Sequence, residues 1–487
     1  MRLRADRSPF RNCGSIFPRR LCITSQLYCP PRQPASSGRR LNYAPGPLRC
    51  SCCHLLSCAS LAPAQNQPHV HRGYISAITS PTEFDLAGEH VLCDSKTEFN
   101  SPLGIGPTAT PCADHIYIGE PLAITEFSRK HGALHAEILN ANNMPTSMKI
   151  TGYGVLDLPL AAETQPSRGV IHADGRRLRL TEKTQIHFAA PLRSLAEIHP
   201  GTWVAYEGHP EADGSLTVLS IAFAPNTISD HEAKMLKRMV IRIVPPDYAA
   251  RKVGQIYIGA YTDTKRPKPG AFQIVANQAT QERVQALGAR LIPAWQRALQ
   301  EEDPLRIRFQ FFVVTRKPID HDAFSFPDGT ILIPEKIVSD LPTDAQLAAI
   351  IASNMAEVLE KQHSRFQTAK EALGATNVAA IGVGFAPVPF LGTGMSLGTA
   401  IAASEMQRRE NQQADRVSLL LLEQAGYDVN QSFLARNAVV HKGKSDVLPY
   451  TIRAENLLAD IGNRNAAALV HTDEAHAANA GWQIGHQ

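Results

Sequence analysis

Most of this sequence has little cysteine and no excess of positive charge. Seven of the nine cysteines lie before residue 60, so only Cys93 and Cys112 remain further along the chain. Residues 1–64 contain ten arginines, no lysine and one acidic residue, a net charge of +9. Because the whole chain is +4, residues 65–487 carry −5. This part has no electrostatic footprint for nucleic acid, and we expect no nucleic-acid partner.

The cysteines do not form a recognisable metal motif. Those before residue 60 lack zinc-site spacing with histidines, so we expect no metal cluster there. Cys93 and Cys112 have two interpretations that depend on the compartment. In an exported protein they are able to form one disulfide, whereas in a reducing compartment they are two small hydrophobic residues.

Residues 1–64 have the composition of a targeting segment. Arginine, proline and serine dominate residues 1–47, where no apolar period appears. Residues 48–64 contain an uncharged, weakly apolar run that follows arginines and closes with Ala62-Pro-Ala64, the order of a secretory signal. An arginine-rich, acid-poor segment is also typical of a mitochondrial transit peptide. We favour an exported protein, periplasmic or associated with the envelope, and keep the mitochondrion as the alternative.

Residues 73–225 contain an internal repeat of short alternating segments. The first copy, 73–142, begins Gly73-Tyr-Ile-Ser-Ala-Ile, and the second, 150–225, contains Gly152-Tyr-Gly-Val-Leu-Asp-Leu near its start. Short alternating runs separated by Gly, Asp and Pro turns predict two tandem small antiparallel β-barrels. The repeat resembles small β-barrel modules of undescribed function from secreted bacterial proteins. It lacks an aromatic platform or a basic groove, so a structural or docking role is expected.

From residue 226 to 300 the pattern becomes helical. Residues 231–240 and 279–300 are amphipathic, and Pro293 is expected to kink or end the first part of the second stretch. We interpret 226–278 as a linker and helical lead-in to the domain that follows.

Two stretches after residue 300 predict strands. Leu305-Arg-Ile-Arg-Phe-Gln-Phe-Phe-Val313 alternates apolar and polar residues at its start. Residues 323–334 are typical of a strand pair folded over Pro327-Asp-Gly329, because Pro, Asp and Gly favour tight turns.

A helix is predicted over residues 344–363. Thr343 is its expected N-cap, and Gln346 completes a capping-box pattern that satisfies two backbone donors. Apolar residues recur at helical spacing, and Asn354 interrupts their stripe. A polar side chain on an apolar face needs a partner or a wet cleft. Taken alone, this segment is an ordinary core helix with a satisfied asparagine.

An uncharged run rich in glycine and proline, 377–404, leads into a second long helix over 400–425. The run is long enough to cross a bilayer, but its prolines and glycines disfavour a spanning helix. We expect a buried hairpin or a loop through which the protein associates with a membrane. The second helix should end at Gly426 with a left-handed cap.

The order of these segments carries a resemblance. A strand, Ala-Phe-x-x-Pro-x-Gly, an Ala-rich helix, a Gly-rich insertion, Asn-x-x-Ala-Asp and Leu-Leu-x-x-Ala-Gly-Tyr-Asp follow one another. Over about residues 280–440 this order resembles gluzincin metallopeptidases of the CAAX prenyl protease and heat-shock protease HtpX type. In that family the first helix carries His-Glu-x-x-His, whose histidines bind zinc and whose glutamate activates the bound water. A glutamate on the second helix is the third protein ligand.

The resemblance places the family's functional positions on different residue types here. His-Glu-x-x-His falls on Ser353-Asn354-Met355-Ala356-Glu357, the third ligand on Asn411 and the supporting aspartate on Asp415. All three ligands and the general base therefore differ from the family pattern. Serine is a poor zinc ligand, and asparagine cannot accept a proton from water. Zinc is the cofactor that the family implies, but its ligands are absent. We expect these polar residues to hydrogen-bond one another across the two helices, and His363 to lie too far along a rigid helix to substitute.

The hairpin is the expected substrate edge. In the family, the corresponding strand binds polypeptide substrates by β-augmentation. The residues that the resemblance places there are Ala323, Phe324, Pro327 and Gly329.

These observations predict an α+β protein in which tandem small antiparallel β-barrels precede a mainly helical, zincin-like peptidase domain with a small sheet. The expected function is that of a metalloendopeptidase-family pseudo-peptidase that binds polypeptide in the envelope. The alternatives are an active zinc metalloendopeptidase with an atypical site, and a structural envelope protein. The predicted segments are 1–64 (targeting), 73–142 and 150–225 (barrels), 226–278 (lead-in), 279–445 (peptidase-like domain) and 446–487 (tail).

Overall fold

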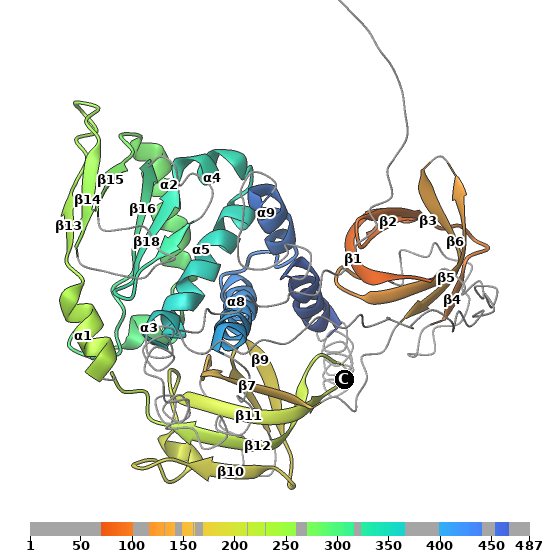
Figure 1. Ribbon diagram of the computed structural model, residues 1–487, viewed down its shortest axis with the longest axis horizontal. Helices are drawn as coiled ribbons and strands as arrows, with labels where there is room; N and C mark the ends of the chain where they lie inside the picture. Colours follow the sequence, from red (N-terminus) through yellow and green to blue (C-terminus); the bar gives the residue numbers. More distant parts are fainter. Residues whose placement is uncertain are drawn as a thin grey trace, which may run out of the picture. The chain divides into compact units, whose positions relative to one another are not determined.

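The computed structural model describes residues 70–100, 116–130, 132–141, 149–158, 160, 169–211, 213–228, 230–259, 270–315, 323–365, 399–440 and 453–466. The chain divides into two compact units, Met1–Gln65 and Asn66–Gln487, and all described residues belong to the second. They form three six-stranded sheets and a set of helices (Figure 1). The predicted α+β class is confirmed, with a barrel-like N-terminal region of sheet and a helical C-terminal region.

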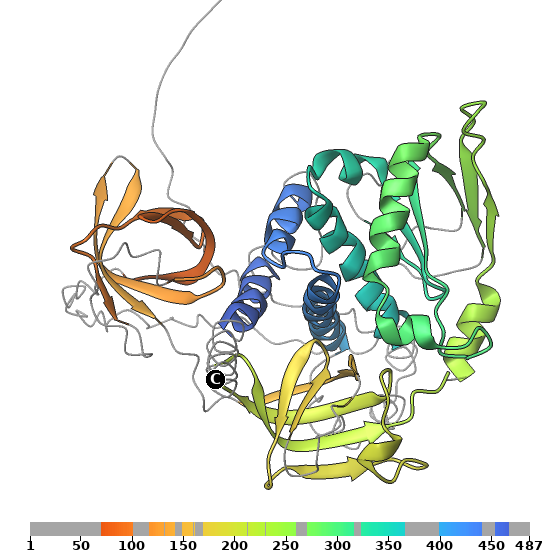
Figure 2. The same ribbon diagram turned by 180° about the vertical axis from the view of Figure 1, so that it is seen from behind.

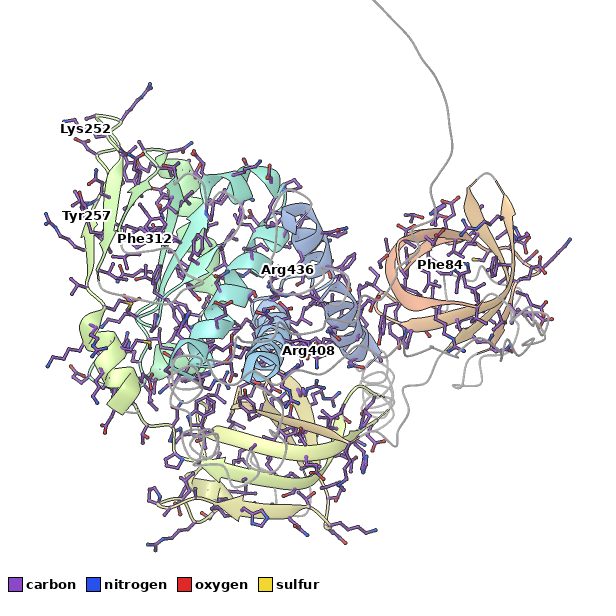
Figure 3. All side chains as sticks on the ribbon, viewed as in Figure 1. Phe84, Lys252, Tyr257, Phe312, Arg408 and Arg436 are labelled. Carbon is purple, nitrogen blue, oxygen red and sulfur yellow. The ribbon has the colours of Figure 1, made fainter. Side chains whose placement is uncertain are left out.

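The first sheet closes on itself. Its strands are β1 (His71–Ser80), β2 (Glu83–Leu86), β3 (Glu89–Leu92), β4 (Glu98–Asn100), β5 (Pro121–Lys130) and β6 (Ala133–Ala141). The path β3-β2-β1-β5-β6-β4 closes because β3 pairs with both β2 and β6. Phe84 is fully buried among the inward-facing residues of this sheet (Figure 3).

The second sheet contains the next six strands. They are β7 (Ile150–Val155), β8 (Gly169–Ala173), β9 (Arg176–Leu180), β10 (Gln185–Phe188), β11 (Trp203–Pro210) and β12 (Leu216–Ala224). In both sheets the first strand pairs with the fifth, the fifth with the sixth, and the second with the third. In both, the third and fourth strands pair in parallel with the sixth. The two sheets therefore share one pairing pattern.

The third sheet has the order β13-β14-β15-β16-β18-β17. Its strands are β13 (Ile241–Val244), β14 (Gly254–Ile258), β15 (Gly270–Ile274), β16 (Gln310–Thr315), β17 (Phe324–Ser325) and β18 (Thr330–Pro334). Residues 226–278, interpreted from sequence as a linker and helical lead-in, thus contribute three strands besides α1 (Asp230–Arg238). These strands have only four or five residues each, too few for their alternation to stand out from a linker.

Apolar residues cover both faces of the third sheet. The helices α2 (Gln278–Leu291) and α5 (Asp344–Leu359) lie beside the third sheet (Figure 2). Phe311 and Val313 of β16 belong to the core that these helices form with the sheet. Val314 belongs to the core on the opposite face, against which Phe312 also packs. Successive side chains of a strand point to opposite faces, so a strand buried on both faces has a continuous apolar run.

The strand predicted over 305–313 begins later than expected, because β16 covers Gln310–Thr315. Ahead of it, the side chain of Gln296 accepts a hydrogen bond from the Ile307 amide (2.9 Å) and donates to the Leu305 carbonyl (3.0 Å). A buried glutamine therefore satisfies backbone groups that a strand partner would otherwise satisfy. The alternation of 305–309 is real, but no strand in the described part of the chain pairs with it.

The helices follow the predicted boundaries closely. α2 ends at Leu291, and Pro293 directly precedes α3 (Ala294–Ala298). Proline has no backbone N–H to donate, so it interrupts a helix and is tolerated at the start of the next one. α8 (Thr399–Gln424) is capped by Gly426 at φ 71°. The others are α4 (Glu335–Asp340), α9 (Gln431–Val440) and a C-terminal helix over 453–466.

The N-cap of α5 differs in one detail from the predicted capping box. Thr343 Oγ1 accepts from the Gln346 amide at 3.2 Å, as expected. The Gln346 side chain, however, donates to Gln431 of α9 (3.1 Å), so it ties two helices together.

Several predicted features lie outside the described residues: the targeting segment, Cys112 and most of the 377–404 run. Cys93 is described; it is disulfide-bonded and buried in the first sheet. Within the described ranges, no helix combines the length and apolarity needed to cross a membrane.

Candidate functional site

Asn354 is buried on α5, and its own helix satisfies it. Its Nδ2 donates to the Ile350 carbonyl one turn earlier, at 3.0 Å. This bond explains how an amide is tolerated within the apolar stripe, because a buried polar group is costly only when it lacks a partner.

Ser353 and Asp415 are joined by a guanidinium. Arg436 of α9 donates through Nη2 to the Ser353 hydroxyl and to Asp415 Oδ1, the latter at 2.8 Å. Arg436 is labelled in Figure 3. One cation therefore links α5, α8 and α9 at two positions that the resemblance assigns to a zinc ligand and its supporting aspartate.

A second guanidinium completes the environment of Asp415. Arg453, on the C-terminal helix, donates to Oδ2 at 2.7 Å and to Oδ1 at 2.8 Å. Burial alone would raise the pKa of Asp415, but Arg453 and Arg436 outweigh it and hold the pKa below its usual value. Asp415 is therefore a buried carboxylate with a double cationic partner.

Glu357 lies beside a serine and a histidine. Ser325 Oγ, on β17, donates to Glu357 Oε2 at 2.5 Å and lies 3.0 Å from His363 Nε2. The expectation that His363 would lie too far away was wrong, because α5 ends at Leu359 and Lys361 takes a positive φ of 50°. The chain turns there and returns the histidine to the same hydroxyl.

Asn411 remains apart from this group. It is half-buried on α8, and within the described ranges its side chain makes no hydrogen bond to Ser353, Glu357 or Asp415. The predicted direct network among the five positions is thus replaced by separate contacts. Long arginine side chains span the gap between helices that these short polar groups leave open.

The side chains at these positions do not fit a zinc ion. Nowhere in the described part of the chain do three His, Cys, Asp or Glu side chains come together in a way that could hold a metal. The Ser353 hydroxyl already accepts from a guanidinium, and the Asn354 amide nitrogen donates within its helix. A zinc site of this class needs three nitrogen, sulfur or carboxylate donors with one open position.

The hairpin predicted at residues 323–334 is confirmed. β17 pairs antiparallel with β18, and Gly329 has a φ of 92°, which the turn requires of a glycine. β17 is the last strand in the sheet order, so its outer side has no strand partner among the described residues. Ala323 and Pro327 are half-buried, whereas Phe324 is buried.

Residues 278–444 match the model of peptidase family M48. This match supports a metallopeptidase family for the domain that runs from α2 through α9. It includes every position carried over from the resemblance: the hairpin, Ser353 to Glu357, Asn411 and Asp415.

The segment that matches this model, called the M48 domain below, also contacts the second sheet, a contact that sequence reasoning missed. Glu360, fully buried just past the end of α5, accepts from the Val155 amide at 3.1 Å and from Gln413 Nε2 at 3.0 Å. Gln413 Nε2 also lies 2.6 Å from the Tyr153 carbonyl.

An arginine reinforces this contact. The Arg365 guanidinium lies 4.7 Å from the ring centre of Tyr153 and 5.6 Å from that of Trp203, within cation–π range. Only the unusual polarity of the segment Glu360-Lys-Gln-His-Ser-Arg365 after an apolar helix hints at it in the sequence.

Two buried carboxyl groups, those of Glu360 and Asp157, interact electrostatically at this seam between the M48 domain and the second sheet. Burial, with Asp157 adding to it, raises the pKa of Glu360 well above its usual value. Burial also raises the pKa of Asp157 to about 7. Burial at this contact therefore favours the protonated form of both carboxyl groups.

Proposed function

We propose that the M48 domain is a pseudo-peptidase, which keeps the fold of the family and binds polypeptide without zinc-dependent cleavage. The observation that carries this proposal is the guanidinium of Arg436 between Ser353 and Asp415. A fixed cation at the family's ligand positions opposes the binding of a second cation there. It also supplies the tie between helices that a metal would otherwise provide.

The chemistry of the neighbouring positions supports the same proposal. Asn354 stands where the family has its general base, and an amide cannot take a proton from water. Glu357 is a possible ligand, but it accepts a short hydrogen bond from Ser325 instead.

Polypeptide binding is proposed at β17. An edge strand offers backbone N–H and C=O groups that an extended chain is able to pair with. β17 has only two residues, so a bound strand would also use the half-buried Ala323 before it.

We also propose that the first two sheets are tandem repeats of one barrel module and that the protein is exported. The shared pairing pattern of the two sheets supports the first point. The disulfide at Cys93 supports the second, because disulfides persist in oxidising compartments.

Metal content separates this proposal from an active enzyme. The full chain, dialysed against zinc and then desalted, should hold less than about one zinc per ten chains by inductively coupled plasma mass spectrometry. Casein should remain uncleaved, with or without EDTA. One zinc per chain with EDTA-sensitive cleavage would overturn the pseudo-peptidase proposal.

An active enzyme with an atypical site has one observation in its favour, since Glu357 and His363 meet at Ser325. If cleavage is found, Glu357→Gln should abolish it. Glu302→Gln, an exposed position on a turn, is the matched control.

Polypeptide binding is measured separately, by fluorescence anisotropy of labelled unfolded casein. Ala323→Pro, which removes a backbone donor next to β17, should weaken binding at least about fivefold. Val240→Pro, next to β13 at the opposite edge of the same sheet, should leave binding unchanged. Equal effects of both changes would contradict binding at β17. If casein does not bind at all, a structural envelope protein becomes the better interpretation.

A further inference from the structure

A cavity of about 380 Å³ lies away from the M48 site, among the second sheet, α8 and the C-terminal helix. Its lining is strongly basic: it includes Arg176 and Arg177 of β9, Arg416 of α8 and Arg464 of the C-terminal helix. Glu423 and Asp460 are the two acidic residues in the lining. Asp174, which pairs with Arg416 at the cavity wall, is a third carboxylate, so four arginines leave an excess of one positive charge.

The turn that carries this basic lining is held firmly against α8. Asp174 and Gly175 connect β8 to β9 with φ values of 57° and 66°. A Cβ at Gly175 would lie 2.5 Å from the backbone of Arg416, so only glycine allows this approach. The cavity wall is therefore preorganised by the backbone.

Two of the four guanidiniums already have strong partners. Arg416 binds both carboxylate oxygens of Asp174, at 2.8 and 2.7 Å. Arg464 donates to Glu423 at 2.6 Å and to the Gly175 carbonyl at 2.8 Å. These pairs build the wall and leave little capacity for a ligand.

The two adjacent arginines of β9 retain unused donors. Nε of Arg176 and Nη1 of Arg177 are buried, and neither has a hydrogen-bond partner within the described ranges. Arg176 Nε lies 3.9 Å from Asp174 Oδ2, beyond hydrogen-bond distance. Guanidiniums with unpaired donors are costly to bury, and an anion in the cavity would stabilise their charge.

His172 lines the cavity as a neutral hydrogen-bond donor. It lies opposite Arg177 across the β8–β9 pair. Burial, with Arg177 and Arg464 adding to it, lowers the pKa of His172 to about 4. The imidazole is therefore neutral at pH 7 and able to donate one hydrogen bond to an anion without adding charge.

We propose that this cavity binds a phosphate monoester, with Arg176 and Arg177 donating to the phosphate group. A phosphate group supplies the negative charge that the two arginines of β9 favour, and guanidinium donors fit its oxygens. The volume, at the lower end of small-molecule sites, suits a phosphate with a small organic group. The bound anion would join the second sheet to α8 and the C-terminal helix.

The test measures the binding of glycerol 3-phosphate, the soluble probe, to the full chain by isothermal titration calorimetry. Glycerol is the neutral control. Arg177→Gln should weaken binding at least about tenfold. Arg179→Gln makes the same charge change two residues along β9, where the guanidinium pairs with Asp213 at 2.6 Å outside the cavity, and should bind like wild type. Arg177→Lys keeps the charge but not the planar fork, and should weaken binding to an intermediate degree. It also serves as the second variant if Arg177→Gln does not fold.

A second arm distinguishes the source of the phosphate. Cosedimentation with vesicles of phosphatidylcholine, with or without phosphatidic acid, tests a lipid headgroup. Binding of either probe that Arg177→Gln weakens and Arg179→Gln does not supports the site, and the probe that binds identifies the source. Absence of binding to both probes, or equal losses in the two variants, overturns the proposal.

Discussion

Replacing Glu360 tests whether the seam between the M48 domain and the second sheet holds a protonated carboxyl group. Glu360→Gln keeps the shape of the neutral acid, and its carbonyl oxygen is able to accept from the Val155 amide and Gln413 Nε2. Glu360→Ala leaves the Val155 N–H and one of the two Gln413 Nε2 hydrogens without an acceptor, while the other keeps the Tyr153 carbonyl. Orphaned buried donors cost about 1–3 kcal/mol each, so the alanine variant should lose about 2–6 kcal/mol of unfolding free energy. The glutamine variant should lose less than about 1 kcal/mol at pH 7.

The pH dependence has a defined sign. The pKa of Glu360 is raised in the folded state, so the folded protein binds this proton more tightly than the unfolded chain. The contribution of Glu360 to the free energy of unfolding is therefore fully present below the pKa of the unfolded chain, 4.5, and is lost as pH rises through the folded pKa. The pKa of Asp157 is raised from 3.8 to about 7, so its contribution to stability also falls as pH rises above 3.8.

Urea unfolding followed by circular dichroism at pH 5.5 and 8.5 measures both effects. Wild type should lose stability between the two pH values, and Glu360→Gln should lose less. Exposed Glu302→Gln is the control and should follow wild type. If Glu360→Gln is as unstable as Glu360→Ala at pH 8.5, the stabilising form is the ionised carboxylate and the reasoning is refuted.

Three further substitutions test other parts of the fold. Asp415→Asn leaves two half-buried guanidiniums facing each other without their buried anion, and it should cost about 3–5 kcal/mol in urea unfolding. A loss below about 1 kcal/mol would contradict the cross-link. Gln296→Ala removes the side chain that satisfies the backbone at 305–307 and should cost about 1–3 kcal/mol, with faster amide hydrogen exchange confined to that segment. Gly288→Ala would place a Cβ 2.5 Å from the ring of Phe311, an overpacking that should cost about 1–3 kcal/mol and lower the midpoint of thermal unfolding. An unchanged midpoint would show that α2 is able to shift away from the sheet.

Local patterns predicted the elements that local physics governs. Thr343 caps α5, Pro293 separates α2 from α3, and Gly426 ends α8 because each residue acts on its own turn of backbone. The hairpin at 323–334 follows equally from its turn residues. The predicted strand start at residue 305 was wrong, because a strand also needs a neighbouring strand to pair with. The backbone at 305–307 instead bonds to the side chain of Gln296.

The candidate site was only half accessible from sequence. Ser353, Asn354, Glu357, Asn411 and Asp415 are predicted as site positions because the resemblance keeps the spacing of the family motif while its residues differ. The arginines that hold Asp415 lie 21 and 38 residues away along the chain, and no local pattern relates them to it.

Amino-acid types limit the chemistry of each side chain, and packing decides which groups that side chain contacts. Asparagine cannot act as a general base wherever the fold puts it, so that inference needed no coordinates. The positions of Arg436 and His363 depended on how α9 packs and where α5 ends. Likewise, Arg176 and Arg177 are only two of many arginines in the printed sequence. The burial that strips their donors of water, and makes an anion favourable there, exists only after β9, α8 and the C-terminal helix have packed together.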